Sequence, residues 1–168
     1  MLSGKSKEDI AEDTYLNGHW KSGWKLVFSR FKLLYKKRLM KKTRINHPDR
    51  NPDFVTGAYS DGVIVGDLLF ISGQASVDFK TSKFVLGTVE EETHRTLQNI
   101  KAILGAAGSA MDDVVKCTVH LSDIGEFDRY NEVYSQYFPG VKPARTTVQS
   151  VLAEGIKVEI DCIVKLPI

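Results

Sequence analysis

The sequence predicts a domain of the α/β (α+β) class, in which each helix packs on a sheet by one face. Several short runs are rich in β-branched residues or alternate between apolar and polar residues, which is typical of strands. Two longer runs repeat apolar residues every three or four positions, which is typical of helices that bury a single stripe. The predicted order is β-β-α-β-α-β-β, and the length of 168 residues allows one domain of ordinary size with chain left over.

The main domain begins with a predicted hairpin. Residues 63–65 and 68–72 have the apolar, β-branched composition of two short strands. Gly66 and Asp67 between them form a two-residue turn of the kind that closes hairpins. We therefore expect these two strands to pair with each other.

An amphipathic helix is predicted next. Thr88 and Glu91 have the spacing of a capping box, so the helix begins at this point. Apolar residues then recur on one face as far as Gly105 or Gly108, either of which ends a helix. A strand is predicted after it over residues 114–121, which alternate in polarity.

A second helix is predicted between that strand and Pro139. Asp123 and Glu126 are suitable caps for its start, and Pro139 with Gly140 stops it. Its apolar stripe is largely aromatic, and a helix with such a stripe buries one face. The stripe contains Ile124, Phe127, Tyr130, Tyr134 and Tyr137.

The last two predicted strands, within residues 143–149 and 156–164, suggest a function. The two-residue period of a strand puts Arg145 and Thr147 on one face of the first strand. Glu159 lies on the polar face of the second. If the two strands lie near one another, Arg145 and Glu159 border one small polar cavity, which suggests a carboxylate site with a group that moves protons. The sequence leaves open the alternative of an ion pair on a solvated face.

Residues 1–52 predict a basic amphipathic N-terminal extension, and residues 53–168 the main domain. Residues 21–44 contain ten Lys or Arg and no acid, and their aromatic and aliphatic residues recur at helical spacing. Four interpretations remain open: a helix on an anionic membrane, a basic arm for nucleic acid, a helix that docks on the main domain, or an extension without a separate role. The rest of the chain is acidic overall, so nucleic-acid binding is not expected of the main domain.

The cysteines and the N-terminus indicate a compartment. Cys117 and Cys162 lie in apolar, strand-like runs, so we expect buried thiols and no disulfide. No apolar run approaches the ~20 residues that span a bilayer, and the N-terminus lacks the apolar core of a secretory signal. A cytoplasmic location is predicted. A mitochondrial one is the alternative, which the four acids within the first thirteen residues disfavour. The four histidines have no ligand spacing, so no metal site is predicted.

Six short motifs follow one another along the main domain, from about residue 57 to residue 165. They are Gly57-Ala58-Tyr59-Ser60, Ile71-Ser72-Gly73-Gln74, Leu97-Gln98-Asn99-Ile100, Asn131-Glu132-Val133-Tyr134, Pro143-Ala144-Arg145-Thr146-Thr147-Val148 and Val158-Glu159-Ile160. In this order they closely resemble the RidA family, also called YjgF. Residues 1–52 lie outside the usual family pattern, which has only a short strand before the first motif.

The resemblance implies a fold and an assembly. The fold is chorismate-mutase-like, with a mixed sheet and two helices on one of its faces. The assembly is a homotrimer whose sheets form a central barrel and whose three clefts lie between neighbouring subunits. The partners implied are other copies of the chain and small 2-imino or 2-oxo carboxylates.

The resemblance also implies an activity, the hydrolysis of reactive 2-imino acids such as 2-iminobutanoate and 2-iminopropanoate to 2-oxo acids and ammonia, without a cofactor. Arg145 matches the carboxylate-binding arginine and Glu159 the glutamate at the cleft, and these two are the predicted catalytic residues. The remaining predicted substrate-binding residues are Tyr59, Ser72, Gly73, Asn131 and Thr147. Thr147 stands where several members have cysteine, so no thiol chemistry is expected there.

Two other functions remain as alternatives at this point. One is a non-catalytic trimer that binds small carboxylates or acts like a chaperone, which would keep Arg145 and make no use of Glu159. The other is a ribonuclease or translation inhibitor, as reported for some family members. The acidic main domain argues against RNA as a partner.

Overall fold

The computed structural model describes residues 28–32, 41–53 and 57–167 of a chain that divides into two units, 1–41 and 42–168. In the first unit residues 28–32 are helical, and Phe28 and Phe31 are exposed. They agree with the predicted helical stripe, and its other positions lie outside the described residues. Within the described ranges, no helix has both the length and the apolar character needed to cross a membrane.

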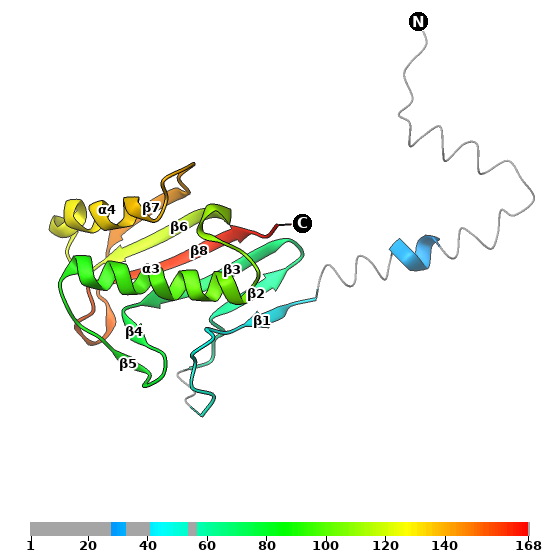
Figure 1. Ribbon diagram of the computed structural model, residues 1–168, viewed down its shortest axis with the longest axis horizontal. Helices are drawn as coiled ribbons and strands as arrows, with labels where there is room; N and C mark the ends of the chain where they lie inside the picture. The colour runs from blue at the N-terminus through cyan, green and yellow to red at the C-terminus, as the bar shows by residue number, and fades with distance from the viewer. Residues whose placement is uncertain (1–27, 33–40, 54–56, 168) are drawn as a thin grey trace, which may run out of the picture. The chain divides into compact units, whose positions relative to one another are not determined.

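The second unit is built on a mixed sheet, as predicted, and this sheet has six strands, one more than the sequence predicted (Figure 1). The strand order is β1-β2-β3-β8-β6-β7, and only β6 and β7 are parallel neighbours. The hairpin around Gly66 and Asp67 is confirmed as β2 and β3. The bounds are β1 Thr43–Ile45, β2 Gly62–Val65, β3 Leu68–Ala75, β6 Val114–Leu121, β7 Ala144–Gln149 and β8 Val158–Lys165, with a separate pair β4 Val77–Asp78 and β5 Lys83–Phe84.

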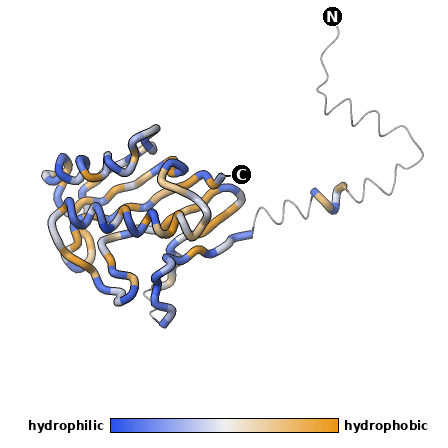
Figure 2. Tube along the Cα trace, in the orientation of Figure 1, coloured by the Kyte–Doolittle hydropathy of each residue, from blue (hydrophilic) through white to orange (hydrophobic). Residues whose placement is uncertain are grey.

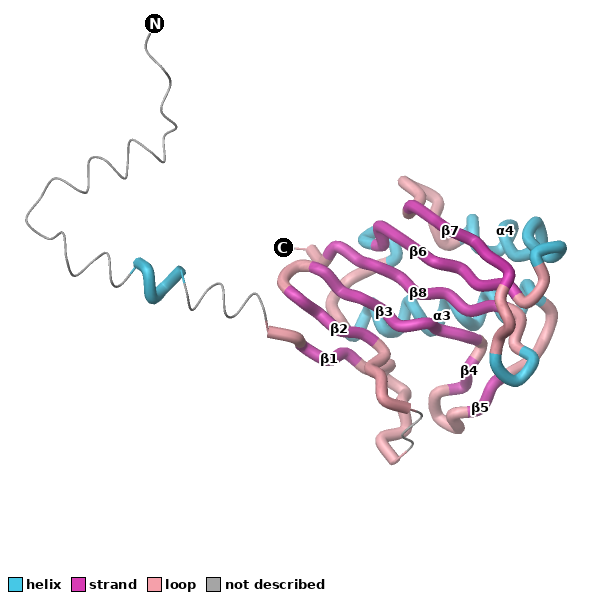
Figure 3. Tube along the Cα trace, turned by 180° about the vertical axis from the view of Figure 1, so that it is seen from behind, coloured by secondary structure: helices cyan, strands magenta, loops and turns pink. Residues whose placement is uncertain are grey.

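Two helices, α3 (Val89–Ala106) and α4 (Phe127–Gln136), cover one face of this sheet, as predicted. Seen from behind, none of the described helices of this unit covers the other face of the sheet (Figure 3). The capping box is confirmed: Thr88 Oγ1 accepts from the Glu91 amide at 3.3 Å, and Glu91 Oε2 accepts from the Thr88 amide at 2.9 Å. A short 3-10 turn precedes α4, which therefore begins just after Glu126.

The core lies between the sheet and the two helices. Alternate residues of β8 are buried beneath the helices, while Glu159 and Asp161 point to the face without helices, called here the bare face. The tube in Figure 2 shows hydrophobic segments along the central strands and mainly hydrophilic loops. The buried side chains of the core include Leu69, Leu97, Ile100, Ile103, Val119, Tyr130, Val158 and Ile160.

The two cysteines are buried in this core as free thiols, which agrees with the prediction. Cys117 of β6 and Cys162 of β8 are direct neighbours across the antiparallel pair, and their Sγ atoms are 3.5 Å apart. The two thiols therefore form a hydrogen bond with each other. The hydrogen bond between the two thiols is the largest cause that lowers the pKa of Cys117. The same hydrogen bond, together with burial, raises the pKa of Cys162.

The folded unit begins earlier than the predicted boundary at residue 53. Strand β1 pairs antiparallel with β2 and forms one edge of the sheet. After it, His47 is buried, and Arg50 forms an ion pair with the buried Asp61. The compact unit starts at Lys42, which differs from the predicted boundary at residue 53. Strand β1 was not predicted, because three paired residues within a basic run have too few alternations to produce a strand signal.

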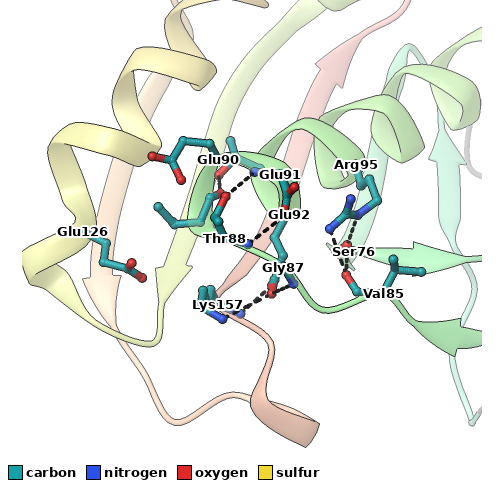
Figure 4. A network of polar contacts seen from close by, with 12 residues as sticks. Ser76, Val85, Gly87, Thr88, Glu90, Glu91, Glu92, Arg95, Glu126 and Lys157 are labelled. Carbon is teal, nitrogen blue, oxygen red and sulfur yellow. Dashed lines mark hydrogen bonds and ion pairs between the residues drawn. The ribbon is translucent and has the colours of Figure 1, made fainter.

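A buried carboxylate fixes the start of β8 (Figure 4). Glu92 of α3 is fully buried and accepts hydrogen bonds from the amides of Gly87 at 3.1 Å and Lys157 at 2.7 Å. Its Oε1 also lies 3.6 Å from the Lys157 Nζ atom. Since Lys157 directly precedes β8, the first turn of α3 holds the strand that carries Glu159.

Candidate functional site

Arg145 lies on β7, at the edge of the sheet, and its side chain is on the helix side. It stands in register with the buried Cys117 of β6, so the two residues share a face. Its Nη1 atom donates to Asn131 Oδ1 at 2.9 Å, and Asn131 belongs to α4. Two of the predicted site residues, Arg145 and Asn131, are therefore in direct contact.

Three aromatic rings of α4 surround the Arg145 guanidinium and are called here the aromatic cage. The guanidinium carbon lies 4.6 Å from the ring centre of Tyr134, 5.4 Å from that of Phe127 and 5.6 Å from that of Tyr130. Ring faces attract a cation at these distances. Burial raises the pKa of both tyrosines, so their hydroxyls stay neutral and add no competing anion. The cage holds Arg145 in one orientation, and no carboxylate in the described part of the chain forms an ion pair with it.

Thr147 lies beside Arg145 on the same face of β7, in register with the buried Val119. Its hydroxyl is buried, and it has no hydrogen-bond partner among the described residues. A buried hydroxyl without a partner is uncommon and calls for a ligand or a water. Arg145, Asn131, Thr147 and the aromatic cage together are called the arginine half of the site.

Glu159 lies on β8 against Gly73 of β3. A Cβ atom added to Gly73 would be 2.0 Å from Glu159 Oε1, so only glycine leaves room for this carboxylate. A β-bulge between Ile71 and Gln74 sets Ser72 and Gly73 opposite a single residue of β8. Gly73 therefore has two structural roles: it leaves room for the Glu159 carboxylate, and it lies in the bulge of β3.

Ser72 and Tyr59 complete this second group. The Ser72 hydroxyl donates to the Ser60 carbonyl at 2.7 Å, and the Ser72 amide donates to the Asp61 carbonyl at 2.9 Å. These bonds attach the segment that carries Tyr59, whose side chain is half exposed, to the strand that carries Gly73. Glu159, Gly73, Ser72 and Tyr59 together are called the glutamate half of the site.

The two halves do not meet within one chain, which corrects the expectation that Arg145 and Glu159 border one cavity in a single subunit. Strand β6 separates β7 from β8. Arg145 is in register with Cys117, and Glu159 with His120, which is three residues further along β6. An odd separation along a strand means opposite faces, so Arg145 is on the helix side and Glu159 on the bare face. For the same reason they form no ion pair with each other.

The sequence reasoning did not identify the group around Asp61. Arg50 binds the buried Asp61 carboxylate, and the His47 ring stacks on Phe79 at 3.9 Å with an interplanar angle of 4°. A cavity of about 510 Å³ is lined by His47, Arg50 and Asp61 together with Tyr59. Asp61 comes directly before the apolar strand β2, and this position could have predicted the group. A carboxylate buried beside a strand requires a cation nearby.

This fold and the two groups of residues define a class of protein. A family model described as Endoribonuclease L-PSP matches residues 51–166, more than half of the chain. The chain belongs to this family, which is the RidA (YjgF) family that its motifs resemble, and that prediction is confirmed.

Named relatives make the placement more specific. A RutC family protein from Saccharolobus solfataricus is 52% identical over 108 residues, which are 64% of this chain and 86% of the relative. The rat protein named 2-iminobutanoate/2-iminopropanoate deaminase is 43% identical over 108 residues, 64% of this chain and 79% of the relative. The crystal structure of RidA from an Antarctic Psychrobacter species has a TM-score of 0.67 at 36% identity and covers 74% of this chain and 100% of its own. The chorismate-mutase-like fold is thereby confirmed.

Proposed function

We propose that this protein hydrolyses reactive 2-imino acids, among them 2-iminobutanoate and 2-iminopropanoate, to 2-oxo acids and ammonia. The family includes reactive-intermediate deaminases, and the rat relative is named for this activity. The observation that carries the proposal is that one chain holds both an arginine in an aromatic cage and a glutamate that fits against a glycine.

Arg145 is the carboxylate-binding residue in this proposal. A guanidinium matches a carboxylate through two parallel hydrogen bonds, which a lysine cannot form. Asn131 and the aromatic cage fix the guanidinium without neutralising it. A 2-imino acid bound in this way has its C2 atom at a defined place.

Glu159 is the acid–base residue. Hydrolysis requires a proton on the imine nitrogen and the attack of water on C2. The resulting amino alcohol then releases ammonia when the hydroxyl proton is removed. One carboxyl group that accepts a proton from water and returns it to nitrogen serves both steps, and positioned help of this kind contributes about 10²–10⁴-fold. The reaction consumes only water, so it calls for no cofactor.

A homotrimer is part of the proposal, because the two halves lie on opposite faces of one sheet. The arginine half is at the β7 edge, and the glutamate half is on the bare face, so each half is open to a neighbouring chain. A closed ring brings the arginine half of one subunit to the glutamate half of the next. A cytoplasmic location also remains part of the proposal.

The experiment measures ammonia from 2-iminobutanoate that an amino-acid oxidase generates in place. The protein is expected to speed ammonia release well above the spontaneous rate, and sedimentation is expected to give three subunits. Release at the spontaneous rate, with 2-oxobutyrate still bound, would instead support the carboxylate binder. Cleavage of RNA by the same preparation without imine turnover would support the ribonuclease.

A further inference from the structure

The loop of residues 46–52, called here the clasp, is fastened at several points to the unit that carries the glutamate half. The His47 amide donates to Asp61 Oδ2 at 2.8 Å, and the His47 ring lies flat on Phe79 at 3.9 Å. The Asn51 amide donates to the Phe79 carbonyl at 3.2 Å. The clasp is therefore an ordered part of the fold, although it precedes the first family motif.

The strongest of these attachments is the ion pair between Arg50 and Asp61. Arg50 Nε donates to Asp61 Oδ2 at 2.6 Å, and Arg50 Nη2 donates to Asp61 Oδ1. The side chains are 15% and 1% exposed, respectively, so solvent screens the pair weakly. A bidentate pair fixes the plane of the guanidinium as well as its position.

The fixed guanidinium lies next to Tyr59. Its central carbon is 6.0 Å from the ring centre of Tyr59 and 5.0 Å from that of Phe79. The bond with Asp61 is the largest cause that raises the pKa of Arg50, and a hydrogen bond with Tyr59 adds to it. A Cβ atom added to Gly57 would lie 3.1 Å from two Tyr59 ring carbons. Gly57 and Arg50 thus both define where the ring lies.

Asp61 connects this contact to the rest of the glutamate half. Its carboxylate holds Arg50, and its carbonyl accepts from the amide of Ser72, which precedes Gly73. Tyr59 is two residues before Asp61 and keeps half of its surface exposed beside the cavity of about 510 Å³. A chain of direct contacts therefore runs from Arg50 to the strand residue that supports Glu159.

We propose that Arg50, held in place by Asp61, is a positioning residue that fixes Tyr59 for the deaminase reaction. This inference rests on the proposed function and adds to it a residue outside the family motifs. Arg50 itself does not touch the substrate. It acts through Tyr59. Removing Arg50 is therefore expected to lower the rate of the reaction by no more than removing the Tyr59 hydroxyl does.

The test is a double-mutant cycle on the full chain with Arg50→Met and Tyr59→Phe, assayed with 2-iminobutanoate. Each single variant is expected to lower kcat/KM about tenfold, and Arg50→Met is expected to cost less than about twofold in the Tyr59→Phe background. Losses that multiply would overturn the inference, because a residue that only stabilises the fold acts independently of Tyr59. Arg129→Lys, in an exposed ion pair on α4, is the control and is expected to keep the normal rate.

A second measurement does not depend on activity. NMR spectra of the ring carbons of ¹³C-labelled tyrosine are recorded for the native chain and for Arg50→Lys. The Tyr59 signal is assigned as the one that Tyr59→Phe lacks. Arg50→Lys keeps the positive charge and loses the planar guanidinium group. The Tyr59 signal is expected to shift or broaden while that of the distant Tyr137 stays unchanged. An unchanged Tyr59 signal would overturn the inference. A native chain that releases no ammonia would overturn the proposed function instead, and the ring signals would still decide the role of Arg50.

Discussion

The arginine half and the glutamate half of the site are built in different ways. Arg145 is enclosed by one helix, which supplies three rings and the side-chain oxygen Oδ1 of Asn131. Glu159 lies on the bare face, where its place depends on a missing side chain at Gly73 and on loop attachments. In the proposed function, the first half binds the substrate carboxylate, and the second presents a partly buried carboxyl group on the bare face. Neither half performs the proposed chemistry alone.

The comparison predicts that the glutamate half controls turnover more than binding. Glu159→Gln keeps the size of the side chain and cannot exchange a proton near neutral pH. The rate of 2-iminobutanoate hydrolysis is expected to fall about 10²–10⁴-fold, as for other positioned acid–base groups. Affinity for 2-oxobutyrate, measured by calorimetry, is expected to change little because Arg145 holds the carboxylate. Equal losses of both would make Glu159 a structural residue. Asp161→Asn, on the same face of β8, is the matched control.

The arginine half is expected to control binding and orientation. Arg145→Lys keeps a positive charge and loses the planar fork, so at least one charged hydrogen bond is lost, at about 1.5–3 kcal/mol each. We expect kcat/KM for 2-iminobutanoate to fall about 100-fold with the fold intact. Arg145→Ala should be worse. A normal rate for the Lys variant would mean that Arg145 is an ordinary strand residue and would remove the proposed site.

Gly73→Ala tests whether the glutamate half depends on the missing side chain. A Cβ atom 2.0 Å from Glu159 Oε1 forces the carboxylate to move. We expect kcat to fall about tenfold or more, since small displacements of catalytic groups are costly, while 2-oxobutyrate still binds. The control is Gly105→Ala on α3, where an added Cβ meets nothing within 4 Å. Unchanged turnover in Gly73→Ala would show that the position of Glu159 is not critical.

The smallest expected effect is a loss of stability in acid near the glutamate half. Burial lowers the pKa of His47, so the folded state disfavours the protonated ring. Stability is therefore full above the unfolded pKa near 6.5 and falls as the pH drops below it, by at most about 1.4 kcal/mol per pH unit for one proton. Thermal unfolding between pH 7.5 and 5.5 measures it. A His47→Gln variant should lose this part of the pH dependence, and an identical slope in both proteins would contradict the assignment.

Local patterns in the sequence predicted much of this fold. The period of two put Arg145 and Thr147 on one face, and the capping box at Thr88 located the start of α3. Local patterns could not predict the order of the strands within the sheet. The insertion of β6 between β7 and β8 is a pairing of distant segments, and no local period encodes it. The Arg50–Asp61 pair was missed for the same reason.

The central claim is that one working site takes its two halves from two chains. Arg145→Ala and Glu159→Gln chains, each inactive alone, are to be co-expressed with different tags, and mixed assemblies purified through both tags. In a closed ring of three subunits, every mixed assembly has one interface of its three, about a third, that combines an intact arginine half with an intact glutamate half. The account predicts that imine hydrolysis recovers to about that fraction of the native rate. Mixed assemblies that stay as inactive as the two single variants would contradict it.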